Sequence, residues 1–163
     1  MAKADVTAEY LREILIYDPL TGIFTNRIKR WVALPGAVSG TVMTIGYIGI
    51  GINDRVWLAH RLAFLYMTGE WPKNHVDHID GNKQNNAWKN LRDVTPIVNL
   101  QNQRRAKRNT RSGLLGVTKN TKGWTSKITV NKVVIYLGTF PTPEEANEVY
   151  MTAKRKLHEG NTL

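Results

Sequence analysis

The chain has 163 residues, of which 42% are hydrophobic and 22% charged, a size and composition typical of one compact domain or two small folded modules. Its 23 Lys and Arg outnumber its 13 Asp and Glu, and the formal charge of +10 favours a polyanionic partner such as nucleic acid, although a merely soluble basic protein has the same balance. The absence of cysteine excludes a disulfide framework and a cysteine-ligated zinc site. Because no segment approaches the roughly 20 apolar residues of a membrane span and no apolar signal core is present, we expect a cytoplasmic protein that is neither secreted nor inserted in a membrane.

The N-terminal part begins with a helix and continues as a small sheet. Thr7 is a suitable N-cap, and apolar residues with helical spacing continue until Asp18-Pro19. Residues 21–28, 47–52 and 55–58 alternate β-branched and aromatic residues between turn signals, which predicts a small antiparallel sheet. Residues 60–67 follow as a helix that ends at Gly69 and packs on this sheet.

Residues 74–105 carry the polar groups best suited to chemistry. We predict a strand at 76–79, a polar loop, a second strand at 91–94 and a helix capped by Thr95-Pro96. Asp77 and His78 are adjacent on the first strand, so their side chains point to opposite faces unless the strand is bulged or twisted. Periodicity alone does not remove this objection to placing both residues in one site.

Taken singly, these polar residues have ordinary structural explanations. A lone histidine in a strand is more often a structural hydrogen-bonding residue than a base. Asn90 and Asn99 by themselves are typical of a turn and a helix surface. We expect His60 to be structural, and we expect four further residues to be exposed in loops or turns, namely His75, Asp80, Asn85 and Asn86.

A basic stripe follows this segment. The run QRRAKRNTRSG, which starts at Gln103, has the composition of a linker. Between Val94 and Pro143 the chain has no Asp or Glu, whereas a solvated charged face normally mixes the two signs. This segregation predicts contacts with DNA phosphates by basic residues that include Arg104, Arg105, Lys107, Arg108, Arg111, Lys119, Lys122, Lys127 and Lys132.

The C-terminal part predicts three strands and a helix. Strand candidates lie near residues 116–119, 124–130 and 133–137, the last two joined by a turn at Asn131-Lys132. Thr142, Pro143 and Glu145 form a capping box with proline at the first helical position, and Gly160 is suited to close the helix.

The run from His60-Arg61-Leu62 through DHIDGN, NLR and VNLQN resembles HNH homing and phage endonucleases, which have a ββα-metal fold. The resemblance implies that His78 is the general base that activates water and that Asn90 orients this histidine. It also implies that Asp77 is a metal ligand and that Asn99 is the second metal ligand. Since Asn99 stands where other branches of the family carry histidine, the chain is an H-N-N variant.

This ligand set has a chemical consequence. A carboxylate and an amide oxygen form a hard site, which suits Mg²⁺, or alternatively Mn²⁺, better than Zn²⁺. Two protein ligands leave positions for water and phosphate oxygens. An imidazole with a pKa near 6.5 is half neutral close to physiological pH and can accept a proton from water.

The segment SGLLGVTKNTKGWTSKITVNKVVIYLGTFPTPEEANEVY resembles the AP-two DNA-binding domain of plant transcription factors and phage endonucleases. In that fold three strands lie in the major groove and the helix backs the sheet. The resemblance implies DNA-facing roles for Lys119, Trp124 and Lys127. Trp124 has a second interpretation as an aromatic that packs within the sheet.

Together these features predict an α+β chain with an HNH endonuclease domain at 1–105 (motif core 74–105), a basic linker at 106–112 and an AP-two-like domain at 113–163. We expect a metal-dependent endonuclease that acts on double-stranded DNA as a monomer or dimer and nicks one strand per active site. The alternative is a non-catalytic DNA-binding protein. An RNA-binding protein is disfavoured because the surface-aromatic RNP signatures are missing.

Overall fold

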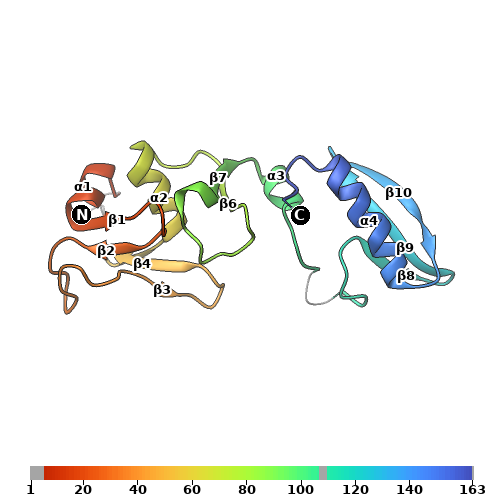
Figure 1. Cartoon of the computed structure of the whole chain (residues 1–163), viewed down its shortest axis with the longest axis horizontal. Helices are drawn as coiled ribbons and strands as arrows, with labels where there is room; N and C mark the ends of the chain where they lie inside the picture. The colour runs from red at the N-terminus through yellow and green to blue at the C-terminus, as the bar shows by residue number, and fades with distance from the viewer. Residues whose placement is uncertain (1–5, 107–109, 163) are drawn as a thin grey trace. The chain divides into compact units, whose positions relative to one another are not determined.

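The computed structural model describes residues 6–106 and 110–162, and it confirms an α+β chain (Figure 1). It forms two compact units, Met1–Val94 and Thr95–Leu163, which are described separately below. Two residues of the predicted basic stripe, Lys107 and Arg108, lie outside the described residues. Within the described ranges, no helix is both long enough and apolar enough to cross a membrane.

The first unit combines two helices, a 3-10 turn and three small antiparallel sheets. The sheets have the strand orders β1-β2, β3-β4-β5 and β6-β7. The elements are α1 (Ala8–Ile14), β1 (Leu15–Tyr17), β2 (Phe24–Asn26), β3 (Thr41–Val42), β4 (Ile48–Ile52), β5 (Arg55–Leu58), α2 (Ala59–Thr68), β6 (His75–His78), η1 (Trp88–Asn90) and β7 (Leu91–Val94).

Helix α1 begins as the sequence predicts and ends sooner. The Thr7 side chain accepts a hydrogen bond of 3.2 Å from the backbone N–H of Tyr10, as an N-cap does. The helix stops at Ile14, and the prediction that it continues to Asp18 is wrong. Leu15 and Tyr17 instead belong to β1, where pairing with β2 buries both side chains, so tertiary burial overrides the helical spacing.

The core of the first unit lies between α1, α2 and the inner faces of β1, β2 and β4. It is built around fully buried side chains such as Leu11, Leu15, Phe24, Ile50 and Leu62. Helix α2 ends at Gly69, whose φ of 83° is left-handed, as predicted from the sequence. This core holds α2 and the following hairpin in place.

The hairpin β6-β7 carries the predicted catalytic strand. Its register pairs Asp77 with Arg92 and His78 with Leu91 and runs without a bulge. The loop before it is fastened by Asp93, whose carboxylate accepts backbone N–H bonds of 3.0 Å from both Lys73 and Asn74. The strand that presents His78 is therefore fixed at its start and along its length.

The second unit comprises α3 (Pro96–Gln101), β8 (Val117–Asn120), β9 (Gly123–Val130), β10 (Val133–Phe140) and α4 (Pro143–Leu157). The three strands form an antiparallel sheet in the order β10-β9-β8, and α4 packs on one face of it (Figure 1). The predicted capping box of α4 is present, with Thr142 and Glu145 bonding to each other's backbone N–H groups. Helix α4 ends at Leu157 with His158 as its C-cap, so Gly160 does not cap it.

The division between the units falls after Val94, whereas the sequence suggested a boundary after Arg105. Helix α3 joins the second unit because its last residue and the segment after it bond to α4 and the residues that follow α4. The side-chain oxygen of Gln101 accepts the backbone N–H of Gly160 at 2.9 Å, and the carbonyl of Gln103 accepts a hydrogen bond from buried Lys154. Residues distant in sequence make these bonds, and local composition does not reveal them.

Candidate active site

His78 is the last residue of β6, and its imidazole is buried at 4% exposure. The Nε2 atom lies 3.0 Å from Oδ1 of Asn86, which comes from the loop between β6 and η1. Asn86 is itself only 2% exposed, so the prediction that it is an exposed loop residue is wrong. The loop folds back so that the Asn86 side chain covers the imidazole of His78.

This contact fixes the tautomer of His78. The Asn86 amide is oriented by a bond from its Nδ2 to the carbonyl of Gln84 at 3.4 Å, which leaves Oδ1 facing the imidazole. A carbonyl oxygen only accepts, so Nε2 carries the proton in the neutral ring. The lone pair of the neutral imidazole is then on Nδ1, which becomes the atom able to accept a proton.

Two further rings surround this histidine. His60, from the first turn of α2, meets His78 edge-on with ring centroids 5.1 Å apart, and Tyr47 packs on both, at 4.9 Å from His60 and 5.8 Å from His78. The ammonium of Lys83 lies 4.6 Å from the centre of the Tyr47 ring. The Nδ1 atom of His60 is buried and has no hydrogen-bond partner among the residues that the structure describes. The sequence predicted only a structural role for His60, and its packing against His78 is found in the structure.

Burial determines the charge of both histidines. It lowers the pKa of His78 below its usual value, although the Asn86 hydrogen bond and the carboxylates of Asp80 and Asp77 act in the opposite direction. Burial together with the neighbouring His78 and Arg61 lowers the pKa of His60 to about 3. Both rings are therefore neutral at neutral pH, the state that a general base requires.

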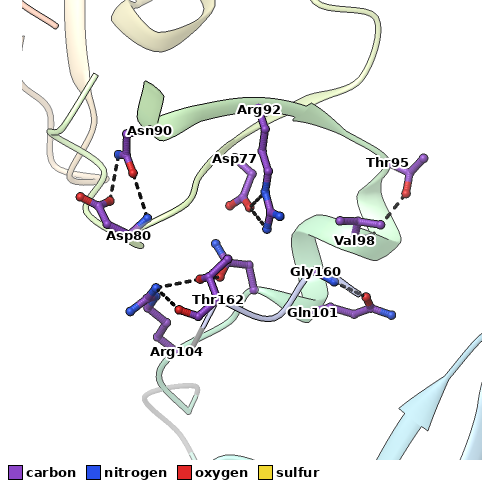
Figure 2. A network of polar contacts seen from close by, with 11 residues as sticks. Asp77, Asp80, Asn90, Arg92, Thr95, Val98, Gln101, Arg104, Gly160 and Thr162 are labelled. Carbon is purple, nitrogen blue, oxygen red and sulfur yellow. Dashed lines mark hydrogen bonds and ion pairs between the residues drawn. The ribbon is translucent and has the colours of Figure 1, made fainter. Parts of the chain in front are cut away.

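Asn90 is buried in η1 and holds the loop that carries Asn86 (Figure 2). Its Nδ2 donates to the Asp80 carboxylate at 2.9 Å and to the backbone carbonyl of Asn85 at 2.7 Å, and its Oδ1 accepts the backbone N–H of Asp80 at 2.9 Å. Both of its side-chain N–H groups and its amide oxygen thus bond to this loop. The resemblance implied that Asn90 orients His78, and the side-chain contact with the imidazole comes from Asn86.

Asp77 is buried and forms an ion pair with Arg92 on the neighbouring strand (Figure 2). Its Oδ2 accepts bonds from Nη2 at 2.8 Å and from Nε at 3.0 Å of that guanidinium. The Asp77 side chain is thus turned toward β7, whereas His78 is turned toward Asn86 and His60. Adjacent residues of an unbulged strand alternate in this way, as expected from the sequence.

The remaining predicted metal ligand, Asn99, lies in α3 and belongs to the second unit. No group of three or more His, Asp or Glu side chains among the described residues is arranged to hold a metal ion. A cation at Asp77 would therefore take most of its ligands from water and substrate oxygens, which is the usual shell of Mg²⁺.

The predicted DNA-binding residues of the second unit do not share one face. Lys127 is exposed on β9, on the side where Tyr136 of β10 is its cross-strand partner. Trp124 lies three positions earlier on the same strand and therefore on the opposite face. Its cross-strand partner there is Lys119, whose ammonium lies 4.6 Å from the centre of the Trp124 ring. Only Lys127 of the three projects from the sheet face that α4 leaves open.

The basic run before the sheet is described only in part. Arg105 and Arg111 are exposed, as a phosphate-binding role requires. Arg104 is partly buried, and its guanidinium donates to the carbonyl and the hydroxyl of Thr162 at 2.9 and 2.7 Å. Arg104 therefore has a structural role in the second unit.

The part of the chain that holds this site matches a known family. Residues 58–101 match the family model described as HNH endonuclease, and the matched segment includes Asp77, His78, Asn90 and Asn99. The match ends before the C-terminal sheet, and the AP-two-like assignment stays a prediction.

Individual relatives carry the same family name. An uncharacterised HNH endonuclease, L560, of Acanthamoeba polyphaga mimivirus is 34% identical over 94 residues, which cover 56% of this chain and 48% of that protein. An SPbeta prophage-derived protein of Bacillus subtilis (strain 168), YosQ, assigned as an HNH homing endonuclease, is 45% identical over 56 residues, covering 34% of this chain and 32% of that protein. The chain thus spans half or less of each relative.

Among solved structures, the HNH homing endonuclease I-HmuI, described for DNA binding and cleavage, matches 55% of this chain and 51% of its own. The sequence identity is 31% and the TM-score 0.42.

Proposed function

We propose that this chain is a metal-dependent endonuclease that hydrolyses phosphodiester bonds in double-stranded DNA, cutting one strand per active site. The observation that carries the proposal is the buried, neutral His78, held by Asn86 within a segment that matches HNH endonucleases. With Nε2 bonded to Asn86, the lone pair on Nδ1 of the neutral imidazole is the acceptor that a general base needs.

In the proposed reaction Nδ1 of His78 removes a proton from a water molecule while the water oxygen attacks phosphorus. The new phosphorus–oxygen bond forms as the bond to the leaving oxygen breaks, and that oxygen takes a proton from solvent. Positioned proton transfer of this kind contributes roughly 10²- to 10⁴-fold to the rate. The Nε2–H bond to Asn86 keeps the ring oriented and stabilises the imidazolium that forms.

Asn90 acts in this proposal as a positioning residue. Its three bonds to Asp80 and Asn85 fasten the loop immediately before Asn86. Loss of these bonds frees the loop, and the orientation of His78 is lost with it. The role that the resemblance gave to Asn90 is thereby kept in an indirect form.

Asp77 and Asn99 are the proposed ligands of a divalent cation, with Mg²⁺ the first choice. A carboxylate fits this ion, and the shortage of other acidic or imidazole ligands among the described residues leaves its shell open to phosphate oxygens. The bound ion would stabilise negative charge on the leaving oxygen. Arg92 shares the Asp77 carboxylate, so the ion must compete with this guanidinium or displace it.

The Asp77–Arg92 ion pair also favours the competing proposal, a DNA-binding protein without turnover. In that case the carboxylate has a structural role and no metal binds. The two proposals differ in whether the protein cuts DNA when a divalent cation is supplied.

The deciding experiment incubates supercoiled plasmid with the full chain in Mg²⁺, in Mn²⁺ and in EDTA. The proposal expects metal-dependent nicking that His78→Ala reduces by about 10²-fold or more while DNA affinity stays at the parental value and the variant remains folded. Asn99→Ala should raise the Mg²⁺ concentration required. Absence of nicking by the parent with either metal would favour the non-catalytic protein, and parental nicking by a folded His78→Ala variant would exclude His78 as the base.

A further inference from the structure

Strand β2 continues into a hairpin arm, defined here as residues 26–37. At its base the backbone N–H of Asn26 donates to the carbonyl of Ala37 at 2.9 Å, and the N–H of Gly36 donates to the carbonyl of Asn26 at 2.7 Å. At its tip Arg30 and Ala33 exchange two backbone hydrogen bonds of 3.0 and 2.9 Å. Trp31 and Val32 are therefore the two central residues of a tight turn.

The backbone of this turn is strained at its largest side chain. Trp31 has a φ of 55°, in the left-handed region, whereas Val32 has a negative φ. A positive φ at the first central residue only is the pattern of a type II′ turn, a position that normally takes glycine because a Cβ is disfavoured there. Nothing in the packing of the turn requires tryptophan, and strain of this kind concentrates at positions with a function.

The apolar side chains of the arm are directed into solvent. Trp31 is 89% exposed and Val32 94% exposed, and Ile28 and Leu34 on the same arm are also exposed. Across residues 6–106 and 110–162, the Trp31 ring takes part in no hydrogen bond, aromatic contact or cation–π contact. A cluster of exposed apolar residues around an aromatic tip is typical of an interaction site.

The charge of the arm specifies the partner. Arg27, Lys29 and Arg30 precede the tip, and the sequence contains no Asp or Glu between Asp18 and Asp54. Two of these cations anchor the arm by donating to backbone carbonyls, Arg27 to Arg12 at 2.8 Å and Arg30 to Gly51, so their charges are not neutralised by carboxylates. A second copy of this basic chain would be repelled by such a uniform positive charge, whereas the phosphates of DNA are attracted to it.

We propose that the hairpin arm contacts double-stranded DNA, with the Trp31 ring inserted between base pairs or stacked on them, Lys29 placed against a phosphate and the anchored Arg27 and Arg30 adding positive charge nearby. This inference rests on the proposed function, in which DNA is the substrate, and it assigns to the hairpin arm the distortion of the duplex. Apolar wedges of this kind unstack a base step and bend the duplex, which makes a phosphodiester bond more accessible. The strained turn holds the ring at the outermost point of the arm.

The test compares Trp31→Gly, Trp31→Phe and, as a control, Leu20→Ala, which removes another exposed apolar side chain of the same unit. Binding to a labelled duplex of mixed sequence is measured in EDTA at low salt by fluorescence anisotropy. Trp31→Gly should bind roughly 5- to 150-fold more weakly, the range expected for the loss of one base–aromatic stacking contact. Trp31→Phe should stay within a few fold of the parent, and Leu20→Ala should match it.

Two further readouts separate this role from a structural one. Because glycine relieves the positive φ, the melting temperature of Trp31→Gly should equal or exceed that of the parent. Duplex should quench tryptophan emission more in the parent than in Trp31→Phe. The proposal is overturned if folded Trp31→Gly binds the duplex as tightly as the parent does. It is also overturned if sedimentation shows that Trp31→Gly has lost self-association while its duplex binding is unchanged. If the parent never nicks DNA but Trp31→Gly still binds duplex more weakly than the parent, the DNA-binding role of the arm is supported and the proposed endonuclease activity is contradicted.

Discussion

The Nε2 atom of His78 lies 3.0 Å from Oδ1 of Asn86, and both side chains are almost fully buried. This pair determines which nitrogen of His78 accepts a proton. It also connects the predicted base to a loop that is held from its other side by Asn90.

Replacing Asn86 with alanine should reduce plasmid nicking by about 10- to 100-fold without weakening DNA binding. The imidazole loses the partner that fixes its tautomer, and the tautomer with Nδ1–H cannot accept a proton at that atom. Asn74→Ala is the matched control, because it removes an exposed asparagine side chain of the same unit. Equal loss of activity in both variants, or none in Asn86→Ala, would show that the contact has no catalytic role.

The pH dependence of cleavage should show the lowered pKa of His78. A base must be neutral, so the rate falls as the pH drops through its pKa, and burial moves that point below the usual value of 6.5. The acid limb of the single-turnover rate should therefore lie below pH 6.5. In Asn86→Ala the residual activity should extend to still lower pH, because the lost hydrogen bond had raised the pKa. An acid limb above pH 6.5 in the parent would contradict the buried, neutral base.

Folding stability should fall in acid because of His60. Its pKa is about 3 in the folded protein and 6.5 as an ordinary histidine, so between these values the unfolded chain binds a proton that the folded chain does not. The stabilisation is complete above pH 6.5 and is lost on acidification, by roughly 1 kcal/mol per pH unit. Urea unfolding across this range should show a smaller slope for His60→Phe than for the parent, and Asn74→Ala, which removes an exposed side chain that does not titrate, should leave the slope unchanged. Equal slopes in all three proteins would mean that His60 is not buried in its neutral form.

Arg92→Ala should make the thermal stability more sensitive to Mg²⁺. Removing the guanidinium takes away the ion pair between Arg92 and Asp77, and because the Arg92 side chain is 27% exposed, the loss of stability should be smaller than the roughly 3–5 kcal/mol of a fully buried pair. A cation that binds this carboxylate in the folded state should raise the melting temperature of Arg92→Ala by about 2 °C more than that of the parent, or roughly 1 kcal/mol. Arg92→Lys retains the charge and serves as the control. An equal response to Mg²⁺ in all three proteins would argue against Asp77 as a ligand.

The two lysines of the C-terminal sheet should differ in DNA binding. Lys127 projects from the open face of β9, whereas Lys119 lies over Trp124 on the other face. Lys127→Ala should lower the log–log salt slope of duplex binding by about 0.9, as loss of one phosphate contact does, and Lys119→Ala should change it less. A larger effect of Lys119→Ala would place the DNA on the other side of the sheet.

Much of the fold is predictable from local sequence. The N-caps at Thr7 and Thr95, the capping box at Thr142 and the left-handed Gly69 identify helix ends, because each depends on bonds or backbone angles within a few residues. The strands of the C-terminal sheet likewise follow from alternation between turns. The last turn expected for α1 is absent because the buried positions of Leu15 and Tyr17 are filled by strand pairing, a tertiary effect.

For the candidate site, the sequence by itself determined the HNH motif and the choice of His78, since motif spacing is a local property of the chain. Only the tertiary structure decided that Asn86 and not Asn90 contacts the imidazole, that His60 packs against it and that Asp77 is paired with Arg92. Each of these contacts depends on how a loop folds back, on a helix brought from earlier in the chain or on strand register. Burial then determines the charge of the histidines, because the free energy of desolvation depends on everything packed around a side chain and not on its neighbours in sequence.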